Sequence, residues 1–396
     1  SEMCIRDSRV SVVIPVYRGR EETLTCIGSV LSAPVHVPLR VIIINDASPD
    51  AELVSVLATF ANDPRVTLLH NAQNLGFVAT VNMGMREAGM DDVVLLNSDT
   101  EVSAGWLDRL QACVYSAADI GTATPFSNNA TICSYPYPEW TGGMSTGLTA
   151  AQADALFAQA NAGLCVDIPT GVGFCIYIRH ACLAQTGLFD EESFGRGYGE
   201  ENDFCARALK RGWRNVACGD VFVFHAGSVS FGAERAVRII EAEQRLLALH
   251  PDYQERLEAF LQADPLLPLR SNVDRARVKL GDIGVVDEKL QLERLLREEQ
   301  RQLIQMVREA RAFVSEREAD VASLQEDVAS LQADYCALEE RLGLQIRDMH
   351  AALDLCEQKL KARETLTGVL KQELKSVKDT GAWRSARKIM NLFKGK

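Results

Sequence analysis

The chain has 396 residues, of which 47% are hydrophobic and 24% are charged, a composition typical of globular proteins and not of disordered ones. Its formal net charge of −12 argues against non-specific binding to nucleic acid, which requires a basic surface. The eleven cysteines form no C-x-x-C pair, so we interpret them as reduced, mostly buried thiols of a cytosolic protein. No apolar run reaches the roughly 20 residues that span a bilayer, and no signal-peptide pattern opens the chain.

Residues 1–8 match nothing downstream, and we interpret them as a foreign or truncated leader. After them, short β-branched runs alternate with helical segments. The expected strands and helices are, in chain order, Val10–Ile14, Glu21–Leu31, Arg40–Ile44, Ala51–Phe60, Val78–Ala88 and Val93–Leu96. Continuous apolar strands are typical of a parallel sheet that helices cover on both faces. The βαβ order predicts right-handed crossovers and a ligand site beyond the carboxyl ends of the strands.

Acidic residues follow two of these strands. Ser48 is expected to cap the helix after the second strand, with Pro49 and Asp50 in its first turn. Asp46 is not needed for that cap, so we expect its carboxylate to be free to face a ligand. Residues 97–99, Asn-Ser-Asp, follow the next apolar strand in the same way.

The middle of the chain is less regular. The segment Thr122–Gly147 is rich in Asn, Pro, Gly and Tyr and predicts an irregular loop region. Strand character returns at Gly173–Ile178 and Val221–His225. Helical patterns occur at Phe204–Lys210, before the second of these strands, and at Glu234–Phe260, after it. The prolines of residues 264–268 end the second helical pattern.

Beyond about Val286, apolar residues alternate steps of three and four, the spacing of a coiled-coil seam. The seam is clearest from Val321 to Leu360, with one register shift beside Gly343. A single helix packed on the preceding domain is the alternative. The last residues, Trp383–Lys396, mix apolar and basic side chains, which fits either an interfacial membrane helix or a solvated charged end.

Eight short motifs, taken together and in this order, resemble glycosyltransferase family 2. They are VSVVIPVY at 10–17, INDAS at 44–48, NLGFVATVN at 74–82, LLNSDT at 95–100, GVGF at 171–174, GLFD at 187–190, GEEND at 199–203 and HAGS at 225–228. Each motif is weak alone, but eight in the family's order are specific. The resemblance covers Arg9 to about Phe231. It implies a GT-A fold, in which helices flank a nucleotide-binding mixed α/β sheet, and an inverting transfer of a sugar from a nucleoside-diphosphate sugar to an acceptor hydroxyl.

The resemblance also implies a divalent cation, Mn²⁺ or Mg²⁺, which stabilises the departing diphosphate. Asp99 matches the final acid of the family's D-x-D-like motif, and His225 matches a second ligand. Asn97 and Ser98 stand where many members carry further acids, so we expect weaker metal binding without nucleotide, and both residues are assigned to the nucleotide-sugar site. An imidazole ligand favours Mn²⁺ over Mg²⁺.

The same resemblance assigns a nucleotide pocket. Pro15 and Tyr17 match the walls of the base and ribose pocket, and Asp46 matches the acid that accepts a hydrogen bond from a pyrimidine ring. Asn74 is expected near the same pocket. Ordinary packing at strand ends is the alternative for these residues.

The catalytic base should be a carboxylate beside the acceptor hydroxyl. Glu201 matches the base position, where the family usually has aspartate, and Asp203 is the second candidate, which otherwise caps the helix or binds the acceptor. The alternative for both is that acids at a helix start only satisfy its dipole. The preceding glycine-rich segment Gly195–Gly199 is expected to be a mobile loop near the acceptor. It is not a dinucleotide motif, because it does not follow the first strand.

We therefore predict a leader at 1–8, a GT-A domain at 9–235, a helical extension and linker at 236–285, a coiled coil at 286–378 and a basic amphipathic tail at 379–396. Expected partners are a UDP- or dTDP-sugar donor, a glycan or lipid-linked acceptor, further copies of the chain through the coiled coil, and a membrane surface contacted peripherally, but no nucleic acid. The expected setting is synthesis of a surface polysaccharide or glycoconjugate, in the cytoplasm at the inner face of the membrane.

Two other functions are alternatives to this interpretation. A nucleotidyltransferase would carry a glycine-rich basic loop after the first strand, and Arg18-Gly19-Arg20 is too little for one. A coiled-coil scaffold with a degenerate transferase domain is the other, and the presence of Asp46, Asp99, Glu201 and His225 argues against such decay.

Overall fold

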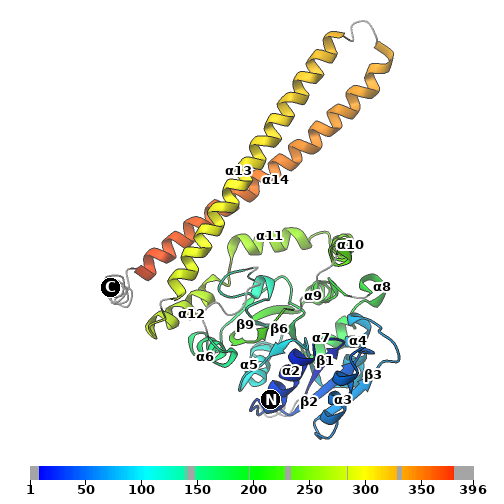
Figure 1. The fold of residues 1–396 in the computed structure, drawn as a ribbon, viewed down its shortest axis with the longest axis vertical. Coiled ribbons are helices and arrows are strands. Elements are labelled where there is room, and N and C mark those ends of the chain that lie inside the picture. Colours follow the sequence, from blue (N-terminus) through cyan, green and yellow to red (C-terminus); the bar gives the residue numbers. More distant parts are fainter. Residues whose placement is uncertain are drawn as a thin grey trace. The chain divides into compact units, whose positions relative to one another are not determined.

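The computed structural model describes residues 9–138, 140, 148–195, 197–227, 233–282, 284–327 and 332–378. The chain divides into two compact units, Ser1–Arg277 and Val278–Lys396 (Figure 1). The division after Arg277 places most of the predicted helical extension in the first unit, and the domain limits at 235 and 285 stay predictions. The expected leader and basic tail lie outside the described residues.

An eight-stranded sheet with the strand order β3-β2-β1-β4-β8-β6-β9-β7 forms the centre of the first unit. Its strands are β1 (Val10–Val16), β2 (Leu39–Asn45), β3 (Val66–His70), β4 (Asp92–Leu96), β6 (Ile120–Phe126), β7 (Cys165–Asp167), β8 (Cys175–Ile178) and β9 (Arg214–Phe222). The strands β3, β2, β1 and β4 are mutually parallel, whereas β8 is antiparallel to both of its neighbours. The predicted mixed sheet is confirmed.

Helices cover both faces of this sheet, as Figure 1 shows. The α-helices described in this unit are α2 (Arg20–Ser32), α3 (Ala51–Phe60), α4 (Phe77–Ala88), α5 (Trp106–Val114), α6 (Ala150–Ala160), α7 (His180–Thr186), α8 (Glu191–Phe194), α9 (Glu200–Lys210), α10 (Ala233–Leu249), α11 (Tyr253–Ala263) and α12 (Leu267–Lys279). Successive residues of β1 enter opposite hydrophobic clusters, with Val12 and Ile14 in one and Val13 in the other. This alternation explains why β1 reads as a continuous apolar run: a strand buried on both faces has no polar side.

The carboxyl ends of β1, β2 and β4 lie at the same edge of the sheet. Val16 pairs with Asn45, and Val13 pairs with Leu95, so the three strands are in parallel register. A two-stranded ladder of β5 (Thr100–Glu101) and β10 (Phe224–His225) lies beyond this edge. The polar turns that follow β1, β2 and β4 therefore face a common region, as in other open parallel sheets.

Two local predictions are wrong. The N-cap of α3 is Asp50 and not Ser48, because the Asp50 carboxylate accepts hydrogen bonds from the backbone N–H of Glu52 and Leu53 at 3.0 Å. The first residues of the expected loop Thr122–Gly147 belong to the fully buried strand β6. The prediction was wrong because β6 contains Pro125, and proline is normally excluded from inner strands.

The second unit contains two long helices, α13 (Gly284–Asp327) and α14 (Gln332–Lys378). Ion pairs join Glu299 to Arg363 and Arg311 to Glu357, so residue numbers fall along α14 as they rise along α13. The two helices therefore form an antiparallel hairpin within one chain. The predicted helical C-terminal region is confirmed, but it is not one continuous helix. Part of the predicted seam, at Val328 and Leu331, lies outside the described residues.

Two further expectations concern cysteines and membranes. The nine cysteines whose side chains the structure describes form no disulfide, and six of them are buried, as expected for structural thiols. None of the helices that the structure describes is both long and apolar enough to cross a bilayer.

Candidate active site

Asp99 and His225 meet at the carboxyl edge of the sheet. The β5–β10 ladder pairs His225 with Thr100, the residue after Asp99, and the Ala226 N–H donates to the Asp99 carbonyl at 2.9 Å. As a result, His225 Nε2 lies 3.3 Å from Asp99 Oδ1, and both side chains keep about 15% of their surface exposed. Two residues that are 126 positions apart in sequence thus share one small polar site.

The neighbours of His225 hold its imidazole in one orientation. Its Nδ1–H donates to the Asn129 carbonyl at 2.7 Å, which leaves the Nε2 lone pair directed toward Asp99. The Phe174 ring stacks on the imidazole with a centroid distance of 5.2 Å. Burial lowers the pKa of His225, but the hydrogen bond and charge of Asp99 outweigh that effect and raise the pKa overall.

These two side chains fit a divalent cation. A histidine whose Nδ1–H is bound to a carbonyl, with a free Nε2, is the usual arrangement of an imidazole ligand. Ligand atoms that bind one ion at about 2.1 Å each lie about 3 Å apart, close to the observed spacing. Within the described part of the chain, no group of three or more His, Cys, Asp or Glu is arranged to hold a metal. The remaining coordination positions would have to come from substrate oxygens or water.

Hydrogen bonds fix the turn at residues 97–99. The Thr100 hydroxyl donates to the Asn97 carbonyl at 2.8 Å, and the Asn97 N–H donates to the Phe174 carbonyl at 2.8 Å. Cys26, beneath this turn, is fully buried, and burial raises its thiol pKa to about 12, so it stays uncharged. Asn97 and Ser98 are both half-buried beside Asp99.

The Asp46 carboxylate is not free, contrary to expectation. It accepts hydrogen bonds from Asn71 Nδ2 at 2.8 Å, from the Leu75 N–H at 2.8 Å and from the Gly76 N–H at 3.0 Å. A carboxylate offers about four acceptor positions, so at most one remains. Asp46 is 4% exposed, and its first role is to shape the turn at residues 71–76.

The other predicted nucleotide residues lie around the same strand ends. Tyr17 directly follows β1, is 37% exposed and stacks against the Arg18 guanidinium, whose carbon lies 5.2 Å from the ring centroid. Pro15 pairs with Ile44 within the sheet and is half-buried. Asn74 is half-buried in the turn that Asp46 holds.

Glu201 lies in the first turn of helix α9, against the Gly173 backbone. A β-carbon at Gly173 would lie 3.5 Å from the Glu201 carboxyl carbon. Burial raises the pKa of Glu201, and hydrogen bonds from the backbone of Glu201, Gly173 and Asn202 lower it by less. Because Phe174 stacks on His225, the Gly173–Phe174 segment links Glu201 to the Asp99–His225 pair. A carboxylate with a raised pKa is suited to take and release protons near neutral pH.

Its neighbour Glu200 is 4% exposed, and burial followed by the charge of Glu201 raises its pKa well above the usual range. Glu200 Oε2 has no hydrogen-bond partner within the described residues. A buried carboxyl group without a cation beside it is stable only in its neutral form. Burial therefore favours the neutral form of Glu200.

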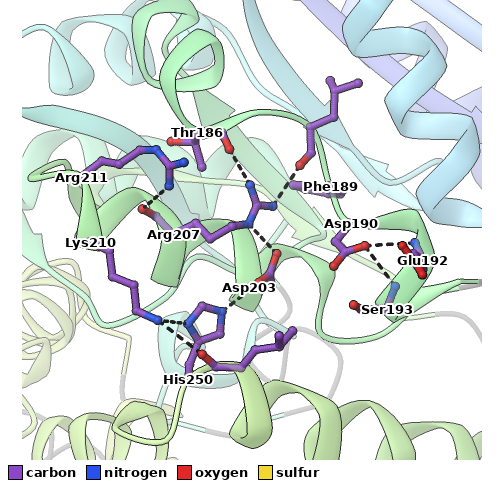
Figure 2. Close-up of polar contacts among 12 residues, drawn as sticks. Thr186, Phe189, Asp190, Glu192, Ser193, Asp203, Arg207, Lys210, Arg211 and His250 are labelled. Carbon is purple, nitrogen blue, oxygen red and sulfur yellow. Dashed lines mark hydrogen bonds and ion pairs between the residues drawn. The ribbon is translucent and has the colours of Figure 1, made fainter.

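Asp203 has a different environment from Glu201, as Figure 2 shows. Its Oδ2 accepts from Arg207 Nε at 2.7 Å, and its Oδ1 accepts from His250 Nε2 at 2.8 Å. Lys210 Nζ in turn donates to His250 Nδ1 at 2.8 Å. The Asp203 side chain is 3% exposed, and its contact with His250 fixes helix α9 against the turn that follows α10. Asp203 as base stays a prediction, and these contacts favour a structural role.

Three residues near the site were not among the predictions. Phe174, Asn128 and Asn129 all contact His225. Two sequence features indicate these residues: the aromatic residue of the GVGF motif and the Asn pair in an irregular region. Asn129, however, acts through its backbone carbonyl, which no residue type reveals. Arg196, in the predicted acceptor loop, lies outside the described residues.

Comparisons with known proteins identify the family of the chain. The model of the family described as "Glycosyl transferase family 2" matches residues 11–158. An uncharacterized glycosyltransferase of Rickettsia bellii is 35% identical over 100 residues, which are 25% of this chain and 14% of that protein. An N-acetylglucosaminyltransferase of Bradyrhizobium sp. (strain ANU 289) is 31% identical over 103 residues, 26% of this chain and 67% of that protein.

Among solved structures, a mannosyltransferase from Pyrobaculum calidifontis in complex with GDP-Man and Mn²⁺ aligns with a TM-score of 0.46 and 17% identity, over 73% of this chain and 80% of that one. The assignment does not depend on that alignment. It rests on the family match, whose range 11–158 includes Asp46 and Asp99, and on the Bradyrhizobium relative. The chain belongs to glycosyltransferase family 2.

Proposed function

We propose that this protein transfers a sugar from a nucleoside-diphosphate sugar to an acceptor hydroxyl, with inversion at the anomeric carbon. The observation that supports it most is the convergence of Asp99, His225 and Glu201 around the Gly173–Phe174 segment. Family membership supports the reaction class. The Bradyrhizobium relative is named for N-acetylglucosamine transfer, so an N-acetylhexosamine is the first donor sugar to test.

In this proposal the chain's own residues have separate tasks. Tyr17 and Pro15 form the wall of the base pocket, and the remaining acceptor position of Asp46 takes the N–H of a pyrimidine, with Asn74, Asn97 and Ser98 nearby. Asp99 and His225 hold Mn²⁺ or Mg²⁺.

A bound cation would act as a Lewis acid and neutralise the charge of the departing diphosphate. Glu201 takes the proton of the acceptor hydroxyl on the side away from the diphosphate, and its raised pKa makes it a better base than an exposed glutamate at neutral pH.

A panel of UDP-, dTDP- and GDP-sugars tests the proposal by slow donor hydrolysis with and without Mn²⁺. We expect one pyrimidine donor to be hydrolysed and a chelator to stop the reaction. If no sugar nucleotide is bound or hydrolysed, the scaffold alternative is correct. Release of inorganic pyrophosphate from a nucleoside triphosphate and a sugar 1-phosphate would instead indicate a nucleotidyltransferase.

Glu201→Gln tests the base. Turnover should fall by about 10²- to 10⁴-fold while UDP affinity stays nearly unchanged. Glu192→Gln, the same change at an exposed acid of α8, is the matched control and should remain active. A fully active Glu201→Gln protein would move the base to another acid of this helix.

We also propose that copies of the chain associate through the helical hairpin. Leu295, Met306 and Phe313 of α13 are 41–49% exposed, and their spacing of eleven and seven residues places them on one face of the helix. Removal of Val286–Lys396, or replacement of these three residues by serine, should reduce the sedimenting species to a monomer. A full-length chain that already sediments as a monomer would refute this assembly. Membrane contact through residues 379–396 stays a prediction.

A further inference from the structure

Helix α12 contacts the active-site edge through a buried polar cluster. The Tyr135 hydroxyl donates to Asp274 Oδ1 at 2.7 Å and accepts from Arg277 Nη1 at 2.9 Å. Tyr135 is 7% exposed, and Asp274 and Arg277 are 3% and 1% exposed. Burial, with the charge of Asp274, raises the pKa of Tyr135 well above its usual range, so the hydroxyl keeps its proton and donates. A second contact, from Arg270 Nη1 to the Ile132 carbonyl at 3.4 Å, joins the same two segments.

Tyr135 closes the loop at residues 127–135, which follows β6. Its N–H donates to the Ser127 carbonyl at 2.8 Å, and the Ser127 N–H donates to the Cys133 carbonyl at 3.2 Å. Inside the loop, the Ser134 hydroxyl accepts from the Ala130 N–H at 2.8 Å. The two ends of the loop are thus tied together, and a shift of Tyr135 changes the position of residues 128 and 129.

Those two residues hold His225. The Asn128 side chain accepts from the His225 N–H at 2.9 Å and donates to the His225 carbonyl at 2.8 Å. The Asn129 carbonyl accepts from His225 Nδ1 at 2.7 Å. A β-carbon at Gly227 would lie 2.3 Å from Asn129 Nδ2, which shows how closely the loop packs on this segment. The loop therefore sets both the backbone position and the ring orientation of His225.

We propose that the Tyr135–Asp274–Arg277 cluster is a positioning device for the cation site: it holds the loop at residues 127–135 in the form that directs His225 Nε2 toward Asp99. The inference rests on the proposed function, because it concerns the affinity of the Asp99–His225 pair for a cation. It assigns α12, which lies beyond the residues that the family model matches, a role at the active site. None of the three residues touches the reacting atoms, so each is a positioning residue.

The test measures cation affinity in the full chain, apart from turnover. UDP is titrated calorimetrically into the protein at a series of fixed Mn²⁺ concentrations, and the concentration that gives half of the maximal UDP affinity is recorded. Loss of a residue that orients a metal ligand typically weakens metal binding by about 10- to 100-fold. Tyr135→Phe acts one step further away, so we expect a weakening of about three- to tenfold, and Asn128→Ala should weaken binding at least as much.

Tyr115→Phe is the matched control. It also removes a phenol hydroxyl that donates to a buried carboxylate, Asp92 Oδ2, at 2.9 Å, but Asp92 begins β4 at the opposite edge of the sheet. Its Mn²⁺ requirement should stay within about twofold of the parent chain. Asp274→Asn is the second variant if Tyr135→Phe does not fold, and the same weakening is expected.

The outcomes distinguish a failure of this inference from a failure of the proposed cation site. If the parent chain needs Mn²⁺ and Asn128→Ala weakens it, but Tyr135→Phe and Asp274→Asn do not, the inference alone is overturned. It is also overturned if Tyr115→Phe weakens Mn²⁺ binding as much as Tyr135→Phe does. If the parent chain binds UDP equally well with and without Mn²⁺, the cation site is overturned, and the inference with it.

Discussion

Among the carboxylate–imidazole pairs that the structure describes in the first unit, two are largely shielded from solvent, and their environments differ. His225 Nε2 and Asp99 Oδ1 are 3.3 Å apart with side chains about 15% exposed, whereas His250 Nε2 and Asp203 Oδ1 are 2.8 Å apart with side chains 3–4% exposed. In the second pair, every side-chain oxygen and ring nitrogen has a protein partner, since Arg207 donates to Asp203 Oδ2 and Lys210 donates to His250 Nδ1 (Figure 2). The first pair retains a free nitrogen lone pair and carboxylate oxygens at an open edge. We therefore propose that the same two residue types bind a ligand in one place, whereas they stabilise the fold in the other.

The largest effect that separates the pairs is expected from Asp99→Ala. A cation clamp is worth several kcal/mol of transition-state stabilisation, so donor turnover should fall by about 10²- to 10³-fold. The melting temperature should change little, because Asp99 is not buried in a saturated network. Turnover and thermal denaturation of the same preparation check this. Unchanged turnover would remove Asp99 from the active site.

The opposite result is expected from Asp203→Asn. Loss of this carboxylate leaves Arg207 without its buried partner, which costs about 3–5 kcal/mol of the free energy of unfolding. For a domain of this size the melting temperature should fall by roughly 10 °C. Mn²⁺ dependence, measured well below the transition, should stay within about threefold. A folded Asp203→Asn protein without activity, beside an active Glu201→Gln protein, would instead identify Asp203 as the base.

A third test uses pH. Glu201 has a raised pKa and acts in its ionised form, so the rate should fall about tenfold per pH unit below that pKa, and this acid limb should lie above pH 4.5, the ordinary value for glutamate. His225 also has a raised pKa, and its protonation would expel a cation. Rate profiles at two Mn²⁺ concentrations distinguish the groups: more Mn²⁺ moves the limb to lower pH only if His225 sets it. A flat profile down to pH 4.5 would contradict both assignments.

The smallest effect is expected at an exposed pair in the second unit. Arg311 is 63% exposed beside Glu357, and pairs of this kind contribute about 0–1 kcal/mol. Arg311→Ala should therefore change the melting temperature by less than about 3 °C and leave turnover unchanged. A larger loss of stability would show that an exposed ion pair stabilises the fold as a buried one does. Burial would then not explain why Asp203 and Asp99 differ.

Much of the parallel half of the sheet was predictable from sequence. The strands β1, β2 and β4 were placed within two residues and α3 at its observed limits, because a doubly buried strand is a continuous apolar run and a helix has a local period. The other half was not predicted as well. The strand β6 contains Pro125, and short β7 depends on pairing with β9, a contact between distant segments.

The candidate site shows the same division. Asp99, His225 and Glu201 were chosen through family motifs, and they lie around one segment in the structure. The partners of His225 and Asp203 could not be predicted from motifs. Asn129 contacts His225 through its backbone, and His250 lies 47 residues from Asp203. The three hydrogen bonds that the turn at residues 71–76 donates to Asp46 were equally hidden, since two of the three donors are backbone N–H groups.

The most direct test is a crystal structure of the protein with UDP and Mn²⁺, with data collected at the manganese absorption edge. The account predicts one anomalous peak in contact with Asp99 and His225 Nε2, UDP beside Tyr17, and Glu201 facing the same cavity. A peak elsewhere, or UDP bound beside Tyr17 with no manganese near Asp99, would contradict it.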